Sequence, residues 1–254
     1  MKIGIVGVGV VGSAIKAGFE NIGHEVLVHD IKLETTIYNV LPTDLIYICL
    51  PTNSDEEGNC DISLVESTLW ALNTLKYKGV VAVKSTIIPG TFKKLKKIFD
   101  PKRLCHVPEF LRAAHAYEDF TEKHNILVIG SPNKKCSSLI CKSHGNYPKN
   151  VLQMKPQEAE FVKYYSNVFK AVKIIFANSF GKICDKFDID YNKVLEAYEL
   201  ENVGETNYLK YFKNGGFGGM CLPKDVRALS KLAENENIDV NLFKFILKEN
   251  KKFI

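Results

Sequence analysis

The stretch from Lys2 to Gly12 reads KIGIVGVGVVG, and it decides the fold. It opens with an apolar, mostly β-branched run of the kind that forms a strand buried on both faces. Glycines then follow in the spacing G-x-G-x-x-G, and the residues after them continue with helical character to Asn21. A strand, a glycine turn and a helix in this order are typical of the first unit of a dinucleotide-binding sheet. The expected fold is therefore α/β, a Rossmann-like doubly wound parallel sheet.

The three glycines have separate mechanical roles in such a turn. The first allows the tight turn, the second lets the backbone approach a pyrophosphate, and the third lets the helix pack on the strand. A second predicted strand ends at Asp30, where a carboxylate can accept a hydrogen bond from the adenosine ribose and repels a 2′-phosphate. The pattern therefore favours NAD over NADP, and Lys32 is the only feature nearby that favours the phosphate. The cofactor-binding residues predicted from this stretch are Gly7, Val8, Gly9, Val10, Val11, Gly12 and Asp30.

Short apolar runs alternate with helical stretches as far as Gly130, and the pattern then changes. The predicted strands are 3–6, 25–29, 45–50, 80–84, 104–107 and 125–129, and the predicted helices among them are 11–21 and 62–75. Beyond Pro156, apolar positions at helical spacing predict one long helix, because proline is favoured in a first helical turn. Shorter helices are expected over 191–198, 226–234 and 242–252. We predict an NAD-binding sheet domain over 1–155, followed by an all-helical domain over 156–254.

The composition excludes several classes of protein. The 254 residues are 46% hydrophobic and 25% charged, and their longest apolar run is far shorter than the ~20 residues of a membrane span. The chain begins with a strand rather than a signal sequence, so we expect a cytoplasmic protein without a membrane partner. The net charge of +5 comes with no nucleic-acid-binding motif, so nucleic acid is not an expected partner. Seven scattered cysteines without a C-x-x-C pair predict neither disulfides nor a metal site.

One cysteine has a sequence context suited to chemistry. Residues 214–225 read NGGFGGMCLPKD, in which four glycines leave backbone N–H groups open to ligand oxygens. Pro223 predicts a helix start just after Cys221, and a thiol at a helix N-terminus with Lys224 close by is expected to have a lowered pKa. Because the thiolate is the nucleophilic form, Cys221 is the candidate nucleophile. The other six cysteines are expected to be small buried apolar residues.

With this loop, the sequence resembles the nucleotide-sugar dehydrogenases, the UDP-glucose 6-dehydrogenase group with its GDP-mannose and UDP-N-acetylmannosamine relatives. The segment GFGGMCLPKD at 216–225 is similar to the catalytic-cysteine segment of that family. Four more stretches agree with the family in order and spacing: LPT at 50–52 with residues 55–61, KSTIIPGT at 84–91, VPEFLR at 107–112 and EFVKYYSN at 160–167. The resemblance covers essentially the whole chain.

The resemblance implies a four-electron oxidation of a sugar C6 hydroxyl to a carboxylate by two NAD in succession, with UDP-glucose as the expected substrate and UDP-glucuronate as product. Cys221 would capture the aldehyde as a thiohemiacetal, and the second hydride transfer would leave a thioester for water to hydrolyse. The implied catalytic residues are Cys221, Lys163, Asn167, Asp225, Glu109 and Thr86.

Each of the other implied catalytic residues has a part in this sequence of steps. Lys163 and Asn167 lie four residues apart on one helix face, and the matching pair in the family supports the oxyanion at the reacting carbon. Asp225 with Thr86 would order or activate the water, and Glu109 would assist hydrolysis as acid or base.

The resemblance also implies which residues hold the two ligands. Residues for NAD follow predicted parallel strands, where open α/β sheets bind ligands, and the helical part adds one more; they are Leu50, Pro51, Thr52, Ser85, Thr86 and Lys224. Those for the nucleotide sugar are Glu109, Phe110, Leu111, Arg112, Lys163, Asn167, Tyr211, Phe217, Gly218 and Gly219. Homodimerisation through the helical part is a property of the family and is expected here.

Two features depart from the family pattern. Ala113 stands where the family commonly has a second glutamate, four residues after Glu109. The family also continues into a second α/β domain that grips the nucleotide. This sequence, which ends at Ile254, is therefore expected to be either a short enzyme that completes its site by dimerisation or uses a smaller substrate, or a fragment of a longer or split protein. Two other functions stay open. One is a two-electron β-hydroxyacid-type dehydrogenase, which needs no thiol, and the other is an NAD-binding module without turnover that pairs with a partner through residues 242–254.

Overall fold

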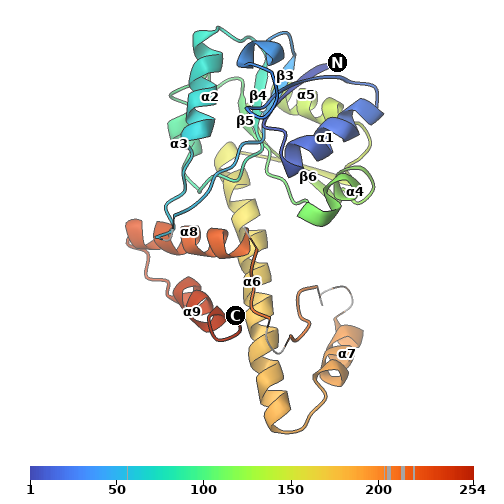
Figure 1. Ribbon diagram of the computed structural model, residues 1–254, viewed down its shortest axis with the longest axis vertical. Helices are drawn as coiled ribbons and strands as arrows, with labels where there is room; N and C mark the ends of the chain where they lie inside the picture. The colour runs from blue at the N-terminus through green and yellow to red at the C-terminus, as the bar shows by residue number, and fades with distance from the viewer. Residues whose placement is uncertain (56, 203, 205–206, 213–214, 220) are drawn as a thin grey trace. The chain divides into compact units, whose positions relative to one another are not determined.

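The computed structural model describes residues 1–254 except 56, 203, 205–206, 213–214 and 220 (Figure 1). The contacts within the chain divide it into two compact units. The sheet unit comprises Met1–Asn53 and Cys60–Lys163, and the helical unit comprises Ser54–Asn59 and Tyr164–Ile254. The predicted strands all fall in the sheet unit, and Cys221 falls in the helical unit.

Seven strands of the sheet unit form one sheet, in the order β2-β1-β3-β4-β5-β6-β7. They are β1 Lys2–Val6, β2 Glu25–His29, β3 Leu45–Ile48, β4 Val80–Val83, β5 Leu104–His106, β6 Ile126–Gly130 and β7 Asn150–Met154. The doubly wound α/β fold is confirmed, but the expectation of an all-parallel sheet is wrong at one junction. There β5 pairs antiparallel with β6 through His106 and Gly130. A strand buried on both faces has the same apolar run in either direction, so its sequence does not reveal its orientation.

Helices of the sheet unit cover both faces of this sheet (Figure 1). Successive residues of β3 serve two cores, because neighbouring side chains of a strand point to opposite faces. Tyr47 packs in one core with Phe19 and Phe120, whereas Ile48 packs in the other with Leu69. The helices over the first core are α1 Val10–Asn21, α4 Ala116–Thr121 and α5 Lys134–His144, and those over the second are α2 Ser63–Thr74 and α3 Phe92–Leu95.

Two elements at one edge of the sheet were not predicted from the sequence. Helix α5 is mainly polar, and it contributes Cys136 and Ile140 to the buried hydrophobic core. Strand β7 is an edge strand that pairs with β6 alone, and its residues are mostly exposed. An edge strand has no need of a continuous apolar run, so the periodicity that identifies the other strands is missing here.

The helical unit has the long helix and the three shorter helices that the sequence predicts. They are α6 Pro156–Lys186, whose first turns belong to the sheet unit, α7 Tyr191–Glu201, α8 Leu222–Asn235 and α9 Leu242–Asn250. Val168, Phe217, Val226, Ile246 and Phe253 are buried together in the core of this unit. Among the helices in the described part of the chain, none is long and apolar enough to cross a membrane.

The apolar residues of α6 occupy two faces of the helix. Val168 and Ile175 are buried in the core of the helical unit. Tyr165 and Phe176, in contrast, are 74% and 58% exposed within this chain. Helical spacing of apolar residues therefore predicted the helix, but it did not separate core side chains from exposed ones.

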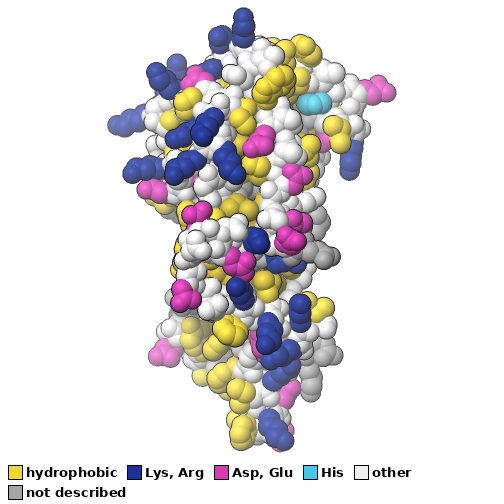
Figure 2. Space-filling view, turned by 90° about the vertical axis from the view of Figure 1, so that its left-hand side faces the viewer, with side chains coloured by type: hydrophobic (Ala, Val, Ile, Leu, Met, Phe, Trp, Pro, Cys, Tyr) yellow, Lys and Arg dark blue, Asp and Glu magenta, His cyan; other side chains and the backbone are white. Residues whose placement is uncertain are grey.

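The lysine-rich segment after β4 lies on the surface of the sheet unit. Lys93, Lys94, Lys96 and Lys97 are all exposed. Figure 2 shows Lys and Arg side chains gathered on the side of the sheet unit that carries α2 and α3. This arrangement is typical of a solvated helix face.

Candidate active site

The glycine loop between β1 and α1 has the geometry that its spacing predicts. Gly7 has φ +91°, and a Cβ built on it would lie 2.7 Å from the carbonyl oxygen of Cys49. A Cβ on Gly12 would lie 1.9 Å from the carbonyl oxygen of Gly7, so only glycine lets the helix approach the turn. Around Gly9 the described residues place no atom within 4 Å of that position. The backbone of Gly9 is therefore open to a ligand at the N-terminus of α1, where a pyrophosphate is stabilised.

Asp30 follows β2 and turns its carboxylate toward the glycine loop. Its Oδ1 accepts a hydrogen bond from the backbone N–H of Lys32 at 2.8 Å, and its Oδ2 accepts one from the N–H of Val8 at 2.6 Å. These two backbone bonds lower the pKa of Asp30. An ionised carboxylate is therefore fixed beside the loop, as the preference for a ribose hydroxyl over a 2′-phosphate requires.

Hydroxyl groups connect the segments that follow β3 and β4. Ser85 Oγ donates a hydrogen bond to the carbonyl oxygen of Leu50 at 2.7 Å, and Thr52 Oγ1 donates one to the carbonyl oxygen of Thr86 at 2.5 Å. Ser85 and Thr52 are buried, whereas Pro51 is exposed. The structure thus brings these five predicted NAD-binding residues together at the carboxyl ends of two neighbouring strands, and the two hydroxyls hold the segments in place.

Glu109 and Lys163 form an ion pair within the sheet unit. Glu109 Oε1 lies 3.3 Å from Lys163 Nζ, and Oε2 accepts a hydrogen bond from the backbone N–H of Leu111 at 2.7 Å. Both side chains are mostly buried, with exposed fractions of 14% and 8%. The ammonium also lies over the ring of Phe110, 5.6 Å from its centroid. Two residues predicted from separate motifs are therefore in contact, and each fixes the position of the other.

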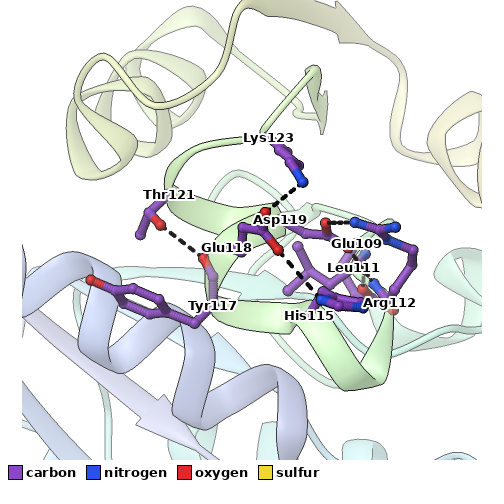
Figure 3. Close-up of polar contacts among 9 residues, drawn as sticks. All are labelled: Glu109, Leu111, Arg112, His115, Tyr117, Glu118, Asp119, Thr121 and Lys123. Atoms are coloured by element: carbon purple, nitrogen blue, oxygen red, sulfur yellow. Dashed lines mark hydrogen bonds and ion pairs between the residues drawn. The ribbon is translucent and has the colours of Figure 1, made fainter.

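Arg112 has its main contacts with Asp119 (Figure 3). Its Nη2 and Nε donate hydrogen bonds to the two carboxylate oxygens at 2.6 and 2.9 Å, and its backbone N–H donates to Oδ2 at 2.8 Å. This pairing lowers the pKa of Asp119. The bidentate bond closes the segment that contains Ala113 onto α4, so Arg112 has a structural task in addition to any contact with a substrate.

Two buried charged residues near these segments were not predicted as site residues, although the motifs contain them. Lys84 is almost fully buried at the end of β4, and its ammonium lies 5.8 Å from the centroid of the Tyr47 ring. Burial lowers the pKa of Lys84, and the nearby Cys49 and Glu109 oppose that change. A lysine after a strand is usually exposed, so only its place inside a motif could have singled it out.

Glu160 is the second buried charge, in the first turns of α6. Its two oxygens accept hydrogen bonds from the backbone N–H groups of Gly90 at 2.9 Å and Phe92 at 2.6 Å. Burial raises the pKa of Glu160 to about 7. The carboxylate thus joins the segment after Thr86 to the helix that carries Lys163.

Cys221 lies at the N-cap of α8 in the helical unit, and it is exposed. The helix begins where Pro223 predicts it. One turn into α8, Asp225 is 1% exposed and accepts a hydrogen bond from Asn167 Nδ2 at 2.6 Å. Lys224 Nζ lies 2.7 Å from the other oxygen of Asp225, as an ion pair without hydrogen-bond geometry. The helical unit therefore brings together four of the predicted residues at the start of one helix.

The glycine loop before Cys221 is partly buried and partly open. Phe217 is a core residue with 1% exposure, whereas no described atom lies within 4 Å of a Cβ built on Gly218 or Gly219. Asn214 and Met220 of the same motif lie outside the described residues. The Phe217 side chain is therefore part of the core, and the two glycines that follow it present open backbone.

Tyr211 was predicted to contact the substrate, and its side chain packs on the helices. Its hydroxyl donates a hydrogen bond to Asp185 at 2.7 Å, and its ring lies against Gly181. A hollow of about 650 Å³ in the helical unit has other residues in its wall; they are Ile174, Glu199, Asn207, Tyr208, Lys210, Phe212, Gly215 and Gly216. Of the predicted substrate residues, then, none is in the wall of this hollow.

The glycine loop, the carboxylate at Asp30 and the doubly wound sheet define a dinucleotide-binding protein. The family model for the NAD binding domain of the UDP-glucose/GDP-mannose dehydrogenase family matches residues 32–144, and the model for the central domain of that family matches residues 157–252. The chain belongs to this family, and its sheet unit contains the NAD-binding domain.

Individual relatives agree with this assignment. The UDP-glucose 6-dehydrogenase of Bacillus subtilis is 28% identical over 99% of this chain and 63% of its own length. The UDP-glucose 6-dehydrogenase of Rickettsia prowazekii is 32% identical over 82% of this chain and 49% of its own length. Among solved structures, a UDP-glucose dehydrogenase from Pyrobaculum islandicum superposes with a TM-score of 0.89 at 28% identity, over 99% of this chain and 68% of that one. The chain thus spans about half to two thirds of the length of these relatives.

Proposed function

We propose that this chain oxidises the C6 hydroxyl of a nucleotide sugar to a carboxylate, with UDP-glucose as substrate, UDP-glucuronate as product and two NAD as oxidants. One observation carries the proposal: an exposed cysteine at the start of α8, followed by a buried aspartate that accepts a hydrogen bond from Asn167. An oxidation that stopped at the aldehyde would need no nucleophile of this kind. The two curated relatives named above support UDP-glucose as the sugar nucleotide.

Capture of the aldehyde would be the task of Cys221. NAD, when bound, accepts the hydride that leaves C6. The thiolate forms the S–C6 bond, and negative charge develops on the former carbonyl oxygen. Lys163 supplies a positive charge for that oxygen, and Asn167 supplies an amide whose Nδ2 has a second N–H beside the one donated to Asp225.

A second hydride transfer from C6 to NAD would convert this adduct to a thioester, and hydrolysis of the thioester would be the task of the carboxylates. Water adds to the acyl carbon, the C–S bond breaks, and the sulfur leaves as thiolate. Asp225 with Thr86 would order this water. Glu109 would act as acid or base and exchange a proton with the water. The contact between Glu109 and Lys163 supports this role, because it holds a carboxylate next to the group that stabilises the oxyanion.

The remaining parts of the proposal concern organisation. We propose that residues 1–155 bind NAD and that residues 156–254 provide the cysteine and a homodimer interface. The exposed aromatic residues of α6, such as Tyr165 and Phe176, support an interface between two copies, because solvent-exposed apolar groups at helical spacing mark association surfaces. The cytoplasmic location stays a prediction from sequence.

Counting NADH against sugar tests the proposed reaction. Purified protein with saturating NAD should yield two NADH for each UDP-glucose consumed, and the product should be an acid. GDP-mannose and UDP-N-acetylmannosamine are the matched comparison substrates. One NADH per substrate would instead indicate a two-electron dehydrogenase. Binding of NAD without NADH from any of the three sugars would indicate a module without turnover.

Asp30 gives a prediction about cofactor choice. In Asp30→Ala the charged hydrogen bond to the ribose hydroxyl is lost, and the KM for NAD should rise about tenfold or more, because such a bond contributes about 1.5–3 kcal/mol. The same change removes the repulsion of a 2′-phosphate, so the preference for NAD over NADP should fall by a similar factor. Initial rates with both cofactors measure this. An unchanged ratio of the two kcat/KM values would contradict the assignment of Asp30.

A further inference from the structure

The side-chain amide of Asn250, in helix α9, binds the main chain of the glycine loop of the helical unit. Asn250 Oδ1 accepts a hydrogen bond from the backbone N–H of Phe217 at 2.7 Å, and its Nδ2 donates one to the carbonyl oxygen of the same residue at 2.8 Å. Asn250 is 4% exposed. One side-chain amide therefore satisfies both main-chain groups of Phe217, as a neighbouring strand would.

The loop fits against α9 without spare space. A Cβ built on Gly216 would lie 2.6 Å from Asn250 Oδ1 and 2.8 Å from Ile254 Cγ1. The N–H of Gly216 donates a hydrogen bond to the carbonyl oxygen of Phe253 at 3.0 Å. Two consecutive residues of the loop are thus bound by the end of α9 and the segment after it, and any larger residue at 216 would disrupt that contact.

A second asparagine binds the main chain just before Gly216. Asn178 of α6 is fully buried, accepts a hydrogen bond from the N–H of Phe212 at 3.1 Å and donates one to the carbonyl oxygen of Gly215 at 2.6 Å. Beyond Phe217, no described atom lies within 4 Å of a Cβ built on Gly218 or Gly219. Among the described residues of the loop, Phe217 is thus the one whose two main-chain groups are both bonded to a side-chain amide.

We infer that Asn250 is a positioning residue for the nucleophile: by fixing the main chain at Phe217, it sets the direction in which the loop enters α8 and presents the Cys221 thiol. The inference rests on the proposed role of Cys221. Burial alone does not require an asparagine here, because a buried amide stabilises a fold only when its partners are in place. Both hydrogen bonds of the Asn250 amide go to the main chain of Phe217.

The test compares Asn250→Ala and the isosteric Asn250→Asp with Asn241→Ala, a control at the exposed N-cap of the same helix. Hydrogen exchange of the loop amides measures how firmly Asn250 holds the main chain of Phe217, which we call the Asn250 clamp. The rate of Cys221 alkylation by iodoacetamide measures the accessibility and reactivity of the thiol. The half-buried Cys141 of the sheet unit is the internal reference. Steady-state NADH formation with UDP-glucose separates kcat from the KM for NAD.

In Asn250→Ala, exchange at Phe217 should accelerate about tenfold, in line with loss of one buried hydrogen bond. The kcat should fall about tenfold or more, the KM for NAD should stay within about twofold, and alkylation of Cys221 but not Cys141 should change by about threefold or more. Asn250→Asp keeps the acceptor for the Phe217 N–H and should lie between the alanine variant and wild type. Asn241→Ala should match wild type.

Several outcomes would overturn the inference. One is wild-type kcat and wild-type Cys221 alkylation in a folded Asn250→Ala. Another is unfolding of both Asn250 variants, which would assign the residue to stability alone. If wild-type protein forms no NADH with any sugar, the proposed function fails, but loop exchange and alkylation still decide whether Asn250 controls the thiol.

Discussion

Replacing Cys221 by serine should reduce formation of the sugar acid by about 1,000-fold or more, because the change removes the group that carries the acyl intermediate. A serine hydroxyl is far less acidic than a thiol, and Cys221 has no histidine base within its own segment to activate a hydroxyl in its place. The variant can still transfer the first hydride, so any NADH that forms should stop at about one per bound sugar. Rapid mixing with UDP-glucose and quantification of both NADH and acid measure the two steps separately.

The matched control is Cys141→Ser, which changes a half-buried cysteine of α5 in the sheet unit. It should retain the full stoichiometry of two NADH per sugar. Thermal melting should be the same for Cys221→Ser and wild type, because an exposed N-cap side chain without a capping hydrogen bond contributes little to stability. Acid formation by Cys221→Ser above about a tenth of the wild-type rate would contradict the thioester route through Cys221.

The parts of the fold that could be predicted are those that depend on one residue type at one position or on a short run of residues. The turn at Gly7 and the approach of α1 at Gly12 depend on the absence of a side chain, and spacing alone reveals both positions. The start of α8 depends on Pro223. Buried strands were found by their apolar runs, whereas the polar α5 and the exposed edge strand β7 have no such run and were missed.

The parts of the site that could not be predicted are contacts between distant residues. Asn167 and Asp225 were both expected in the site, but a hydrogen bond between residues 58 positions apart is a property of the packed chain. The attachment of Arg112 to Asp119 and the clamp of Asn250 on Phe217 are of the same kind. Buried Lys84 and Glu160 were also missed, because charged residues are mostly exposed and their sequence context gave no sign of burial.

Stability of the sheet unit should fall by about 4 kcal/mol between about pH 7 and pH 5, owing to three buried histidines. The pKa of His106 is lowered to about 3 and that of His124 to about 4, and the pKa of His144 is lowered well below its usual value. Burial is the main cause in each, and the nearby Lys84 ammonium adds to it. In all three rings Nδ1 contacts a backbone carbonyl, which only accepts hydrogen bonds, so the neutral Nδ1–H form fits the structure.

The direction follows from proton uptake in the two states. Below about pH 6.5 the histidines of the unfolded chain bind protons that the folded chain does not, so each one lowers the free energy of unfolding by about 2 kcal/mol at pH 5. Glu160 acts in the opposite direction. Its pKa is raised to about 7, so the folded chain takes up the proton first, and folding gains about 2 kcal/mol over the same range. The combined effect of the three histidines is larger than that of Glu160, so the net free energy of unfolding falls between pH 7 and pH 5.

Urea unfolding followed through Trp70, the single tryptophan and a residue of α2, measures the sheet unit at each pH. His124→Asn should reduce the difference between pH 7 and pH 5 by about 2 kcal/mol, because the unfolded chain then has one fewer group to protonate. His115→Asn is the matched control, since His115 is an exposed histidine of the same unit. Glu160→Gln should enlarge the difference by about 2 kcal/mol, because it removes the opposing proton uptake. Stability that is constant or increasing toward pH 5 in wild-type protein would show that these histidines are not held neutral in the folded state.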